Sequence, residues 1–238
     1  MNFFGHTVLA VRRSTVPAFV LGAMLPDFAT MIRARAPRTE HTDIDSGMQF
    51  HWRTDEAFHR SAAFLTLTHR AVGWLSARGV RSGSALAVAH VGVEVLLDAA
   101  LAGDDCAQQA YRAALEGAAH EELGRFVGWA SEEQRGRFDA LRARLLARGA
   151  VAGDVAPETV AERLRYALAD RPRLALDDAS VLTVREWART VRPEIDACAA
   201  ALIQDLTAQL LWPTPLVLCR SRATREGPLK RVQMRGGG

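Results

Sequence analysis

The nine residues HVGVEVLLD, from His90 to Asp98, place three ionisable side chains in an otherwise apolar stretch. His90, Glu94 and Asp98 recur at every fourth position, so in a helix they lie on one face. The intervening Val and Leu residues make the other faces apolar, and a helix that is apolar on most sides is usually buried. Because buried ionisable groups are rare unless they are paired or bind a metal, the stretch predicts a metal site on a core helix.

The same spacing occurs earlier in the chain, in HWRTDEAFH, where His51, Asp55 and His59 are four residues apart. Eight helical residues rise about 12 Å, so the two ends of one such stretch do not bind the same ion. A site therefore takes one or two groups from each stretch and more from elsewhere. The best additional candidates are His6, in the apolar FFGHTVLA, and Asp27, which follows a proline at an expected helix break.

The composition favours a single all-α domain. The chain has 238 residues, 49% of them hydrophobic and 24% charged, which is ordinary for a globular protein with a full core. Alanine and leucine abound, and hairpin signals are scarce. Helices are expected over residues 2–12, over STVPAFVLGAMLPDFATMIR with an interruption at Pro26, and over 52–78, 84–102, 104–128 and 178–211, with further helices after Ser131 and Pro157 and a loop over 36–47.

The positive charge is concentrated at the end of the chain. Residues 219–238 contain six basic residues and one acid, so residues 1–218 carry a net charge of −2 against +3 for the whole chain. We therefore expect a helical bundle over residues 1–218 and a disordered basic tail over residues 219–238. The bundle itself gives no strong sign of nucleic-acid binding.

The amino-terminal part and the cysteines favour a cytoplasmic location. VPAFVLGAMLP is shorter than the roughly 20 apolar residues of a membrane span, and no positively charged segment precedes an apolar run as in a signal peptide. Cys106, Cys198 and Cys219 are scattered, without a CxxC pair, which is typical of free thiols in a reducing compartment.

The residue types predict hydrolysis assisted by a divalent ion. Imidazole and carboxylate ligands without thiolate suit Mn²⁺, Fe²⁺ or Zn²⁺, or Mg²⁺ if carboxylates dominate. Such an ion lowers the pKa of bound water and offsets charge on phosphoryl oxygens. The expected metal ligands are His6, His51, Asp55, His90 and Asp98; the expected catalytic residues, with a ligand role open, are Asp27 and Glu94; the expected phosphate-binding residues are Arg53, Arg60 and Arg70.

Four segments in this order carry a resemblance to a known family: MNFFGHTVLA, LGAMLPDF, GMQFHWRTDEAFH and an apolar helix with acids four apart. Together they resemble the acyl carrier protein phosphodiesterase family, which is similar in turn to the all-helical HD phosphohydrolases. The resemblance implies an HD-domain-like fold, a divalent ion such as Mn²⁺, and release of 4′-phosphopantetheine from acyl carrier protein. It marks His6, Asp27, His51, Asp55, Glu94 and Asp98, and Asp27 matches the aspartate regarded as essential in that family.

The resemblance covers roughly residues 1–105 and includes departures from the family pattern. Trp52 stands where the family has arginine, Glu94 where it has aspartate, and Ala99 where it has histidine. Two other functions therefore stay open beside a metal-dependent phosphodiesterase. One is a non-catalytic helical binding module with a structural or residual metal site, and the other is a hydrolase of nucleotides or phospholipid headgroups.

Overall fold

The computed structural model describes residues 1–118, 121–149 and 151–211. Within these ranges the chain is all-α, as predicted, and the described residues form no strand beyond an isolated bridge between Arg38 and Gly128. The predicted basic tail and Cys219 lie outside the described residues. The helices are α1 (Phe3–Arg13), α2 (Pro17–Met31), α3 (Thr42–Arg60), α4 (Ala62–Ser76), α5 (Ser82–Leu101), α6 (Asp105–Gly117), α7 (Glu121–Gly124), α8 (Glu132–Arg148), α9 (Pro157–Leu168) and α10 (Asp178–Leu211).

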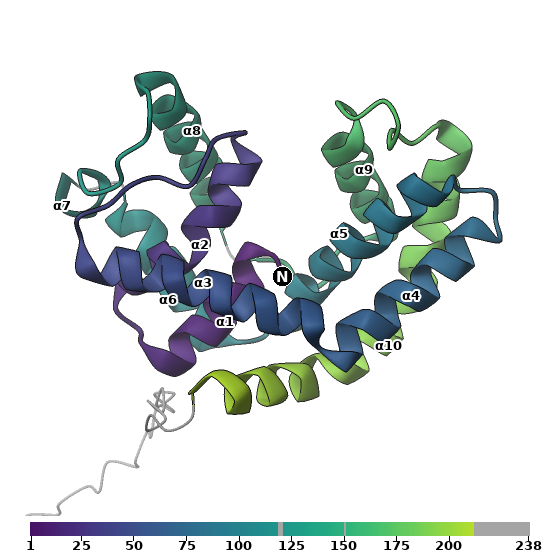
Figure 1. Cartoon of the computed structure of the whole chain (residues 1–238), viewed down its shortest axis with the longest axis horizontal. Coiled ribbons are helices and arrows are strands. Elements are labelled where there is room, and N and C mark those ends of the chain that lie inside the picture. The colour runs from purple at the N-terminus through teal and green to yellow at the C-terminus, as the bar shows by residue number, and fades with distance from the viewer. Residues whose placement is uncertain (119–120, 150, 212–238) are drawn as a thin grey trace, which may run out of the picture.

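The helices form two groups joined by the consecutive helices α3 and α4 (Figure 1). On one side α2 packs along α3 and against α1 and α6, and on the other α10 packs against α4, α5 and α9. The amino terminus lies between the two groups, close to α1, α3 and α5 (Figure 1). The first hundred residues therefore meet near the middle of the molecule.

The single helix expected over residues 52–78 is two helices, and this prediction was wrong. Ser61 has an extended backbone with φ −65° and ψ 140°, and its hydroxyl accepts a hydrogen bond from the Phe64 N–H. Serine in this role caps the first turn of α4. The loop expected over 36–47 is also shorter, because α3 begins at Thr42, after an amino-terminal cap by His41.

The interruption expected at Pro26 is also wrong, since α2 continues through it to Met31. A proline inside a helix costs about 3 kcal/mol or more. Leu21, Met24, Leu25 and Phe28 are fully buried on the same helix. Burial stabilises each such side chain by about 1.5–3 kcal/mol, which outweighs the proline. Asp27 therefore extends from a continuous helix.

Two glycines bring the backbones of α2 and α3 into contact. A Cβ atom on Gly22 would lie 2.1 Å from the Ile44 carbonyl oxygen, and one on Gly47 would lie 2.2 Å from the Phe19 carbonyl oxygen. No larger residue fits at either position without moving backbone. This close crossing fixes the register of the two helices, and His51 follows Gly47 by about one turn.

Helix α5 is long and apolar enough, by length and composition alone, to cross a membrane. Of its most apolar window, 56% is buried inside the protein. A Cβ atom on Gly92 would lie 2.6 Å from the ring of Trp187 in α10, so that ring packs directly on the α5 backbone. The helix packs as the core helix expected from its sequence.

Candidate metal centre

Three potential ligands meet between the first three helices. His6 from α1, Asp27 from α2 and His51 from α3 have ligand atoms within 4.8 Å of one another. The His6 side chain is fully buried, and the His6 and His51 rings lie with their centroids 3.8 Å apart and their planes tilted by 30°. We call these three residues the inner group.

Hydrogen bonds determine which ring nitrogen of each inner histidine is free. The Thr54 hydroxyl donates to the His51 carbonyl oxygen at 2.8 Å, so it accepts from His6 Nδ1–H at 2.7 Å. His51 Nδ1 lies 2.9 Å from the Ala23 carbonyl oxygen, which only accepts, so His51 Nδ1 carries a proton as well. Both rings therefore present an Nε2 lone pair, the orientation found in metal-binding histidines.

Two facing polar atoms of the inner group lack a hydrogen-bond partner. His6 Nε2 and Asp27 Oδ2 are buried, lie 3.9 Å apart and make no hydrogen bond within the part of the chain that the structure describes. Burial lowers the pKa of His6, lowers that of His51 to about 3, and raises that of Asp27 well above its usual value. Unpaired buried polar atoms are costly, and a divalent cation would satisfy both. Two neutral imidazoles and one carboxylate fit such an ion.

A second cluster lies between α3 and α5. His59 Nε2 is 3.1 Å from His90 Nε2, and Glu94 Oε1 is 3.3 Å from the former nitrogen and 3.2 Å from the latter. All three residues are partly exposed, and their ligand atoms lie within 4.8 Å of one another. We call these residues the outer group.

Asp55 lies between the two groups. Its Oδ1 is 3.7 Å from His6 Nε2, and its Oδ2 is 3.2 Å from His59 Nδ1. Burial opposes ionisation of Asp55, but the hydrogen bond from His59 and the positive charge of the nearby Met1 α-ammonium group outweigh burial and hold its pKa far below the usual value. The α-ammonium group of Met1 lies 2.8 Å from Asp55 Oδ1 and 3.1 Å from Glu94 Oε1. Both carboxylates thus share one positive charge in this structure.

Asp98 was expected to bind metal, but the structure brings it into neither group. Its carboxylate accepts hydrogen bonds from the Gly5 N–H at 2.8 Å and the Phe4 N–H at 3.3 Å. It therefore fixes the first turn of α1, which carries His6. Burial raises the pKa of Asp98 to about 7, against the lowering effect of the two backbone N–H groups. Asp98 positions an inner ligand rather than adding one.

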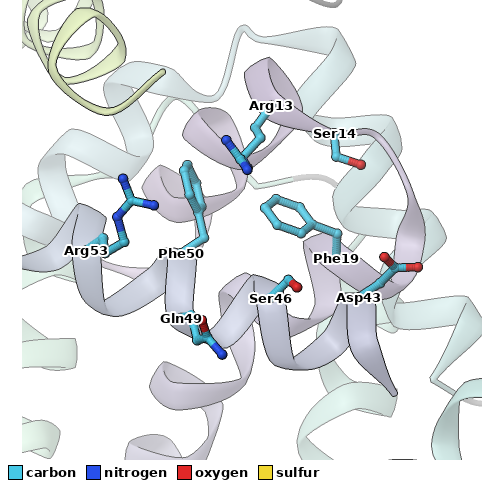
Figure 2. Close-up of a pocket in the computed structure, with 8 residues that line it drawn as sticks. All are labelled: Arg13, Ser14, Phe19, Asp43, Ser46, Gln49, Phe50 and Arg53. Carbon is cyan, nitrogen blue, oxygen red and sulfur yellow. The ribbon is translucent and has the colours of Figure 1, made fainter. Parts of the chain in front are cut away.

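The three arginines expected to bind phosphate make contacts away from both groups. Arg60 pairs with Glu56 on α3, and Arg70 pairs with Glu194 on α10. Arg53 lines a separate cavity of about 430 Å³ between α1, α2 and α3. Figure 2 shows the residues that line this cavity, and none belongs to the inner or outer group: Arg13, Ser14, Phe19, Asp43, Ser46, Gln49, Phe50 and Arg53.

The sequence pattern thus identified most of the residues that converge. It placed six of these residues at one centre. The structure instead divides them into an inner set (His6, Asp27 and His51), an outer set (His90 and Glu94) and Asp55 between the two. His59 was part of the fourth-residue pattern but was not among the expected ligands. Thr54 was missed, because nothing in the sequence indicates which hydroxyl meets a histidine.

Comparison with protein-family models, with curated proteins and with solved structures gives no match to this chain. The resemblance to acyl carrier protein phosphodiesterases therefore stays a prediction from the sequence. The residues themselves show that clusters of His, Asp and Glu capable of holding a metal ion exist among the described residues.

Proposed function

We propose that the protein is a metal-dependent phosphodiester hydrolase with a divalent ion in the inner group. The pair formed by His6 Nε2 and Asp27 Oδ2 carries this proposal: both atoms are buried, face each other, and have no hydrogen-bond partner among the described residues. A folded protein rarely retains two such atoms side by side unless a ligand satisfies them. Asp27, predicted as catalytic, becomes a metal ligand in this arrangement.

The surrounding residues hold the ligands in place. Thr54 and the Ala23 carbonyl oxygen orient the two imidazoles, so little rotamer freedom is lost when an ion binds. Asp55 stays ionised at the edge of the group and adds negative charge there. When bound, a divalent ion at such a site lowers the pKa of a coordinated water and offsets charge on phosphoryl oxygens.

The substrate class rests on the resemblance of residues 1–105. It favours the phosphodiester that joins 4′-phosphopantetheine to acyl carrier protein. Loss of this group from purified holo acyl carrier protein, followed by mass spectrometry, tests that substrate directly. Nucleotide diesters and phospholipids in the same assay distinguish the other hydrolase function.

Activity and metal content test the proposal together. The purified protein is stripped with chelator, reloaded in turn with Mn²⁺, Fe²⁺, Zn²⁺ and Mg²⁺, and assayed on bis-p-nitrophenyl phosphate. We expect metal-dependent turnover that Asp27→Asn reduces by at least about 100-fold, because loss of a ligand exceeds the effect of residues that only orient ligands. Glu56→Gln, an exposed acid on α3, is the matched control and should keep full activity.

Two outcomes would separate this proposal from its alternatives. A protein that binds an ion stoichiometrically but turns over no diester in the panel is a helical binding module with a structural ion. A protein that binds none of the four ions at the inner group has no metal centre there, and the hydrolase proposal is then wrong.

A further inference from the structure

We infer that the outer group binds a second divalent ion, so that the centre holds two metals with Asp55 between them. The catalytic meaning of this pair rests on the proposed function, whereas binding of the second ion does not. The inference depends on the geometry of His59, His90 and Glu94.

Three donor atoms of the outer group point to one place. His59 Nδ1 lies 2.8 Å from the Asp55 carbonyl oxygen, which only accepts, so this nitrogen carries a proton, and whenever the ring is neutral Nε2 keeps the lone pair. That free nitrogen faces His90 Nε2 at 3.1 Å. The same oxygen of Glu94 lies within 3.3 Å of each nitrogen.

Two imidazole nitrogens at this separation need a proton or a cation between them. If both carry lone pairs, they repel each other, and only a shared proton or a bound cation makes the contact favourable. Neutral imidazoles and a carboxylate are ligands for Zn²⁺, Fe²⁺ or Mn²⁺. The fixed Nδ1 bond of His59 supplies the orientation that metal-binding histidines usually have.

Asp55 connects the two groups. Its Oδ1 lies 3.7 Å from His6 Nε2 of the inner group, and its Oδ2 lies 3.2 Å from His59 Nδ1, the ring nitrogen on the side away from the outer ion. The carboxylate can therefore reach an inner ion through Oδ1 while it orients a ligand of the outer ion through Oδ2. In two-metal hydrolases the ions are about 3.5–4 Å apart and stabilise the attacking and leaving oxygens of the displacement.

The charge of such a centre suits a phosphodiester. Asp27, Asp55 and Glu94 bring three negative charges, while two divalent ions and the Met1 α-ammonium group beside Asp55 and Glu94 bring five positive charges. The remaining positive charge attracts an anionic substrate, and no arginine has to enter the site. Glu94, predicted from the sequence as a catalytic base, becomes a ligand of the second ion.

Metal stoichiometry in matched variants tests the inference. The full-length protein, stripped and then dialysed against Zn²⁺ or Mn²⁺, is measured for bound metal by mass spectrometry, and Mn²⁺-loaded samples are examined by EPR. We expect two ions and a spin-coupled signal in the wild type, and one ion without coupling in both His90→Ala and Asp27→Asn. His69→Ala, an exposed histidine on α4, is the control and should bind two ions.

The His90 side chain is 45% exposed, so its removal should leave the fold intact; His90→Gln and far-UV circular dichroism check this. One ion in the wild type that is retained in His90→Ala and lost in Asp27→Asn would overturn the second site and leave the proposed function standing. One ion with the opposite pattern would support the outer site and overturn the inner one, and with it the proposed function. No bound ion in any variant would overturn both.

Discussion

The inner and outer groups use the same residue types but differ in how they are held. The inner atoms are buried and lack partners, while the outer atoms are partly exposed and bonded to one another. The inner geometry is set by backbone contacts, namely the α2–α3 crossing at Gly22 and Gly47 and the bonds from the first turn of α1 to Asp98. The outer geometry depends mainly on side-chain rotamers, with one backbone contact, the hydrogen bond from His59 Nδ1 to the Asp55 carbonyl oxygen. The inner group is therefore preorganised, and the outer group can adjust.

Preorganisation has a cost when no ion is bound. Unpaired buried polar atoms destabilise the folded state by about 1–3 kcal/mol each. An ion that binds only the folded protein removes this penalty. Added metal should therefore raise the midpoint temperature of thermal unfolding, and binding at the inner group should contribute first. Changes to each group can therefore be compared through stability as well as through activity.

The largest effect should come from breaking the backbone contact that builds the inner group. Gly47→Ala places a Cβ atom 2.2 Å from the Phe19 carbonyl oxygen, so α2 and α3 must move apart. We expect unfolding in urea to show a loss of about 3 kcal/mol or more, because the obstacle is backbone rather than a flexible side chain.

The control for this variant is Gly73→Ala on α4, where an added Cβ atom meets nothing within 4 Å. Alanine there should stabilise the protein by about 0.5–1 kcal/mol, since glycine is unfavourable inside a helix. A Gly47→Ala protein as stable as the wild type, with its inner metal site intact, would show that the crossing does not hold this group.

The sequence predicted which residue types form the site better than it predicted that they form two separate groups. Fourth-residue spacing on α3 and α5 identified His51, Asp55, His90 and Glu94, because helical periodicity alone determines which residues share a face. It could not indicate how two helices align. That alignment depends on close backbone contacts such as the one at Gly22. In the sequence, Gly22 cannot be told apart from any other glycine in a helix.

Helix boundaries were predictable where a local signal dominates. The Ser131 cap and Pro157 at a first turn were confirmed, since each acts within its own helix. Pro26 misled the prediction because tertiary burial of α2 outweighs a local preference. Asp98 was predicted as a ligand because it lies on the same helix face as His90 and Glu94. A carboxylate on that face is also a good acceptor for the first turn of a neighbouring helix, and Asp98 has this role toward α1.

In the metal-free protein, acid and alkali should act on different groups. Burial lowers the pKa of His51 to about 3, so below pH 6.5 the unfolded chain binds a proton that the folded protein does not. Stability should then fall by up to about 1.4 kcal/mol per pH unit as the pH drops toward 3. Hydrogen bonds to Asp55 and Glu94 raise the pKa of His59 to about 9, so its contribution is complete below pH 6.5 and is lost as the pH rises to 9.

Urea unfolding of chelated protein across this pH range separates the two effects. We expect His51→Gln to reduce the pH dependence of the free energy of unfolding only below pH 6.5. His59→Gln should reduce it only between pH 6.5 and about 9. If either substitution changed both sides equally, the two groups would titrate as one unit.

A smaller effect should follow from removing the hydroxyl that orients His6. Thr54→Val deprives His6 Nδ1–H of its acceptor and the His51 carbonyl oxygen of its donor. We expect the free energy of unfolding to fall by about 1–3 kcal/mol. The affinity of the inner group for its ion, measured by calorimetric titration, should fall about 10–100-fold. Affinity at the outer group should stay unchanged.

Thr68→Val is the matched control, because the Thr68 hydroxyl donates to the Phe64 and Leu65 carbonyl oxygens of its own helix. Its removal should cost less than 1 kcal/mol or so and leave both ions in place. An equal loss of metal affinity in the two variants would mean that Thr54 has no special relation to His6.

The smallest effect should come from Arg60, which the sequence predicted to bind phosphate near the stretch from His51 to His59. Its side chain is 78% exposed and lies 2.8 Å from Glu56 on the same helix, a pair worth only about 0.3–0.5 kcal/mol. Arg60→Ala should leave the KM for bis-p-nitrophenyl phosphate unchanged, because the metal ions rather than this guanidinium balance the substrate charge. A KM at least tenfold higher, with kcat unchanged, would instead show that Arg60 contacts the substrate. Surface charge beside the outer group would then contribute to binding of the anionic substrate.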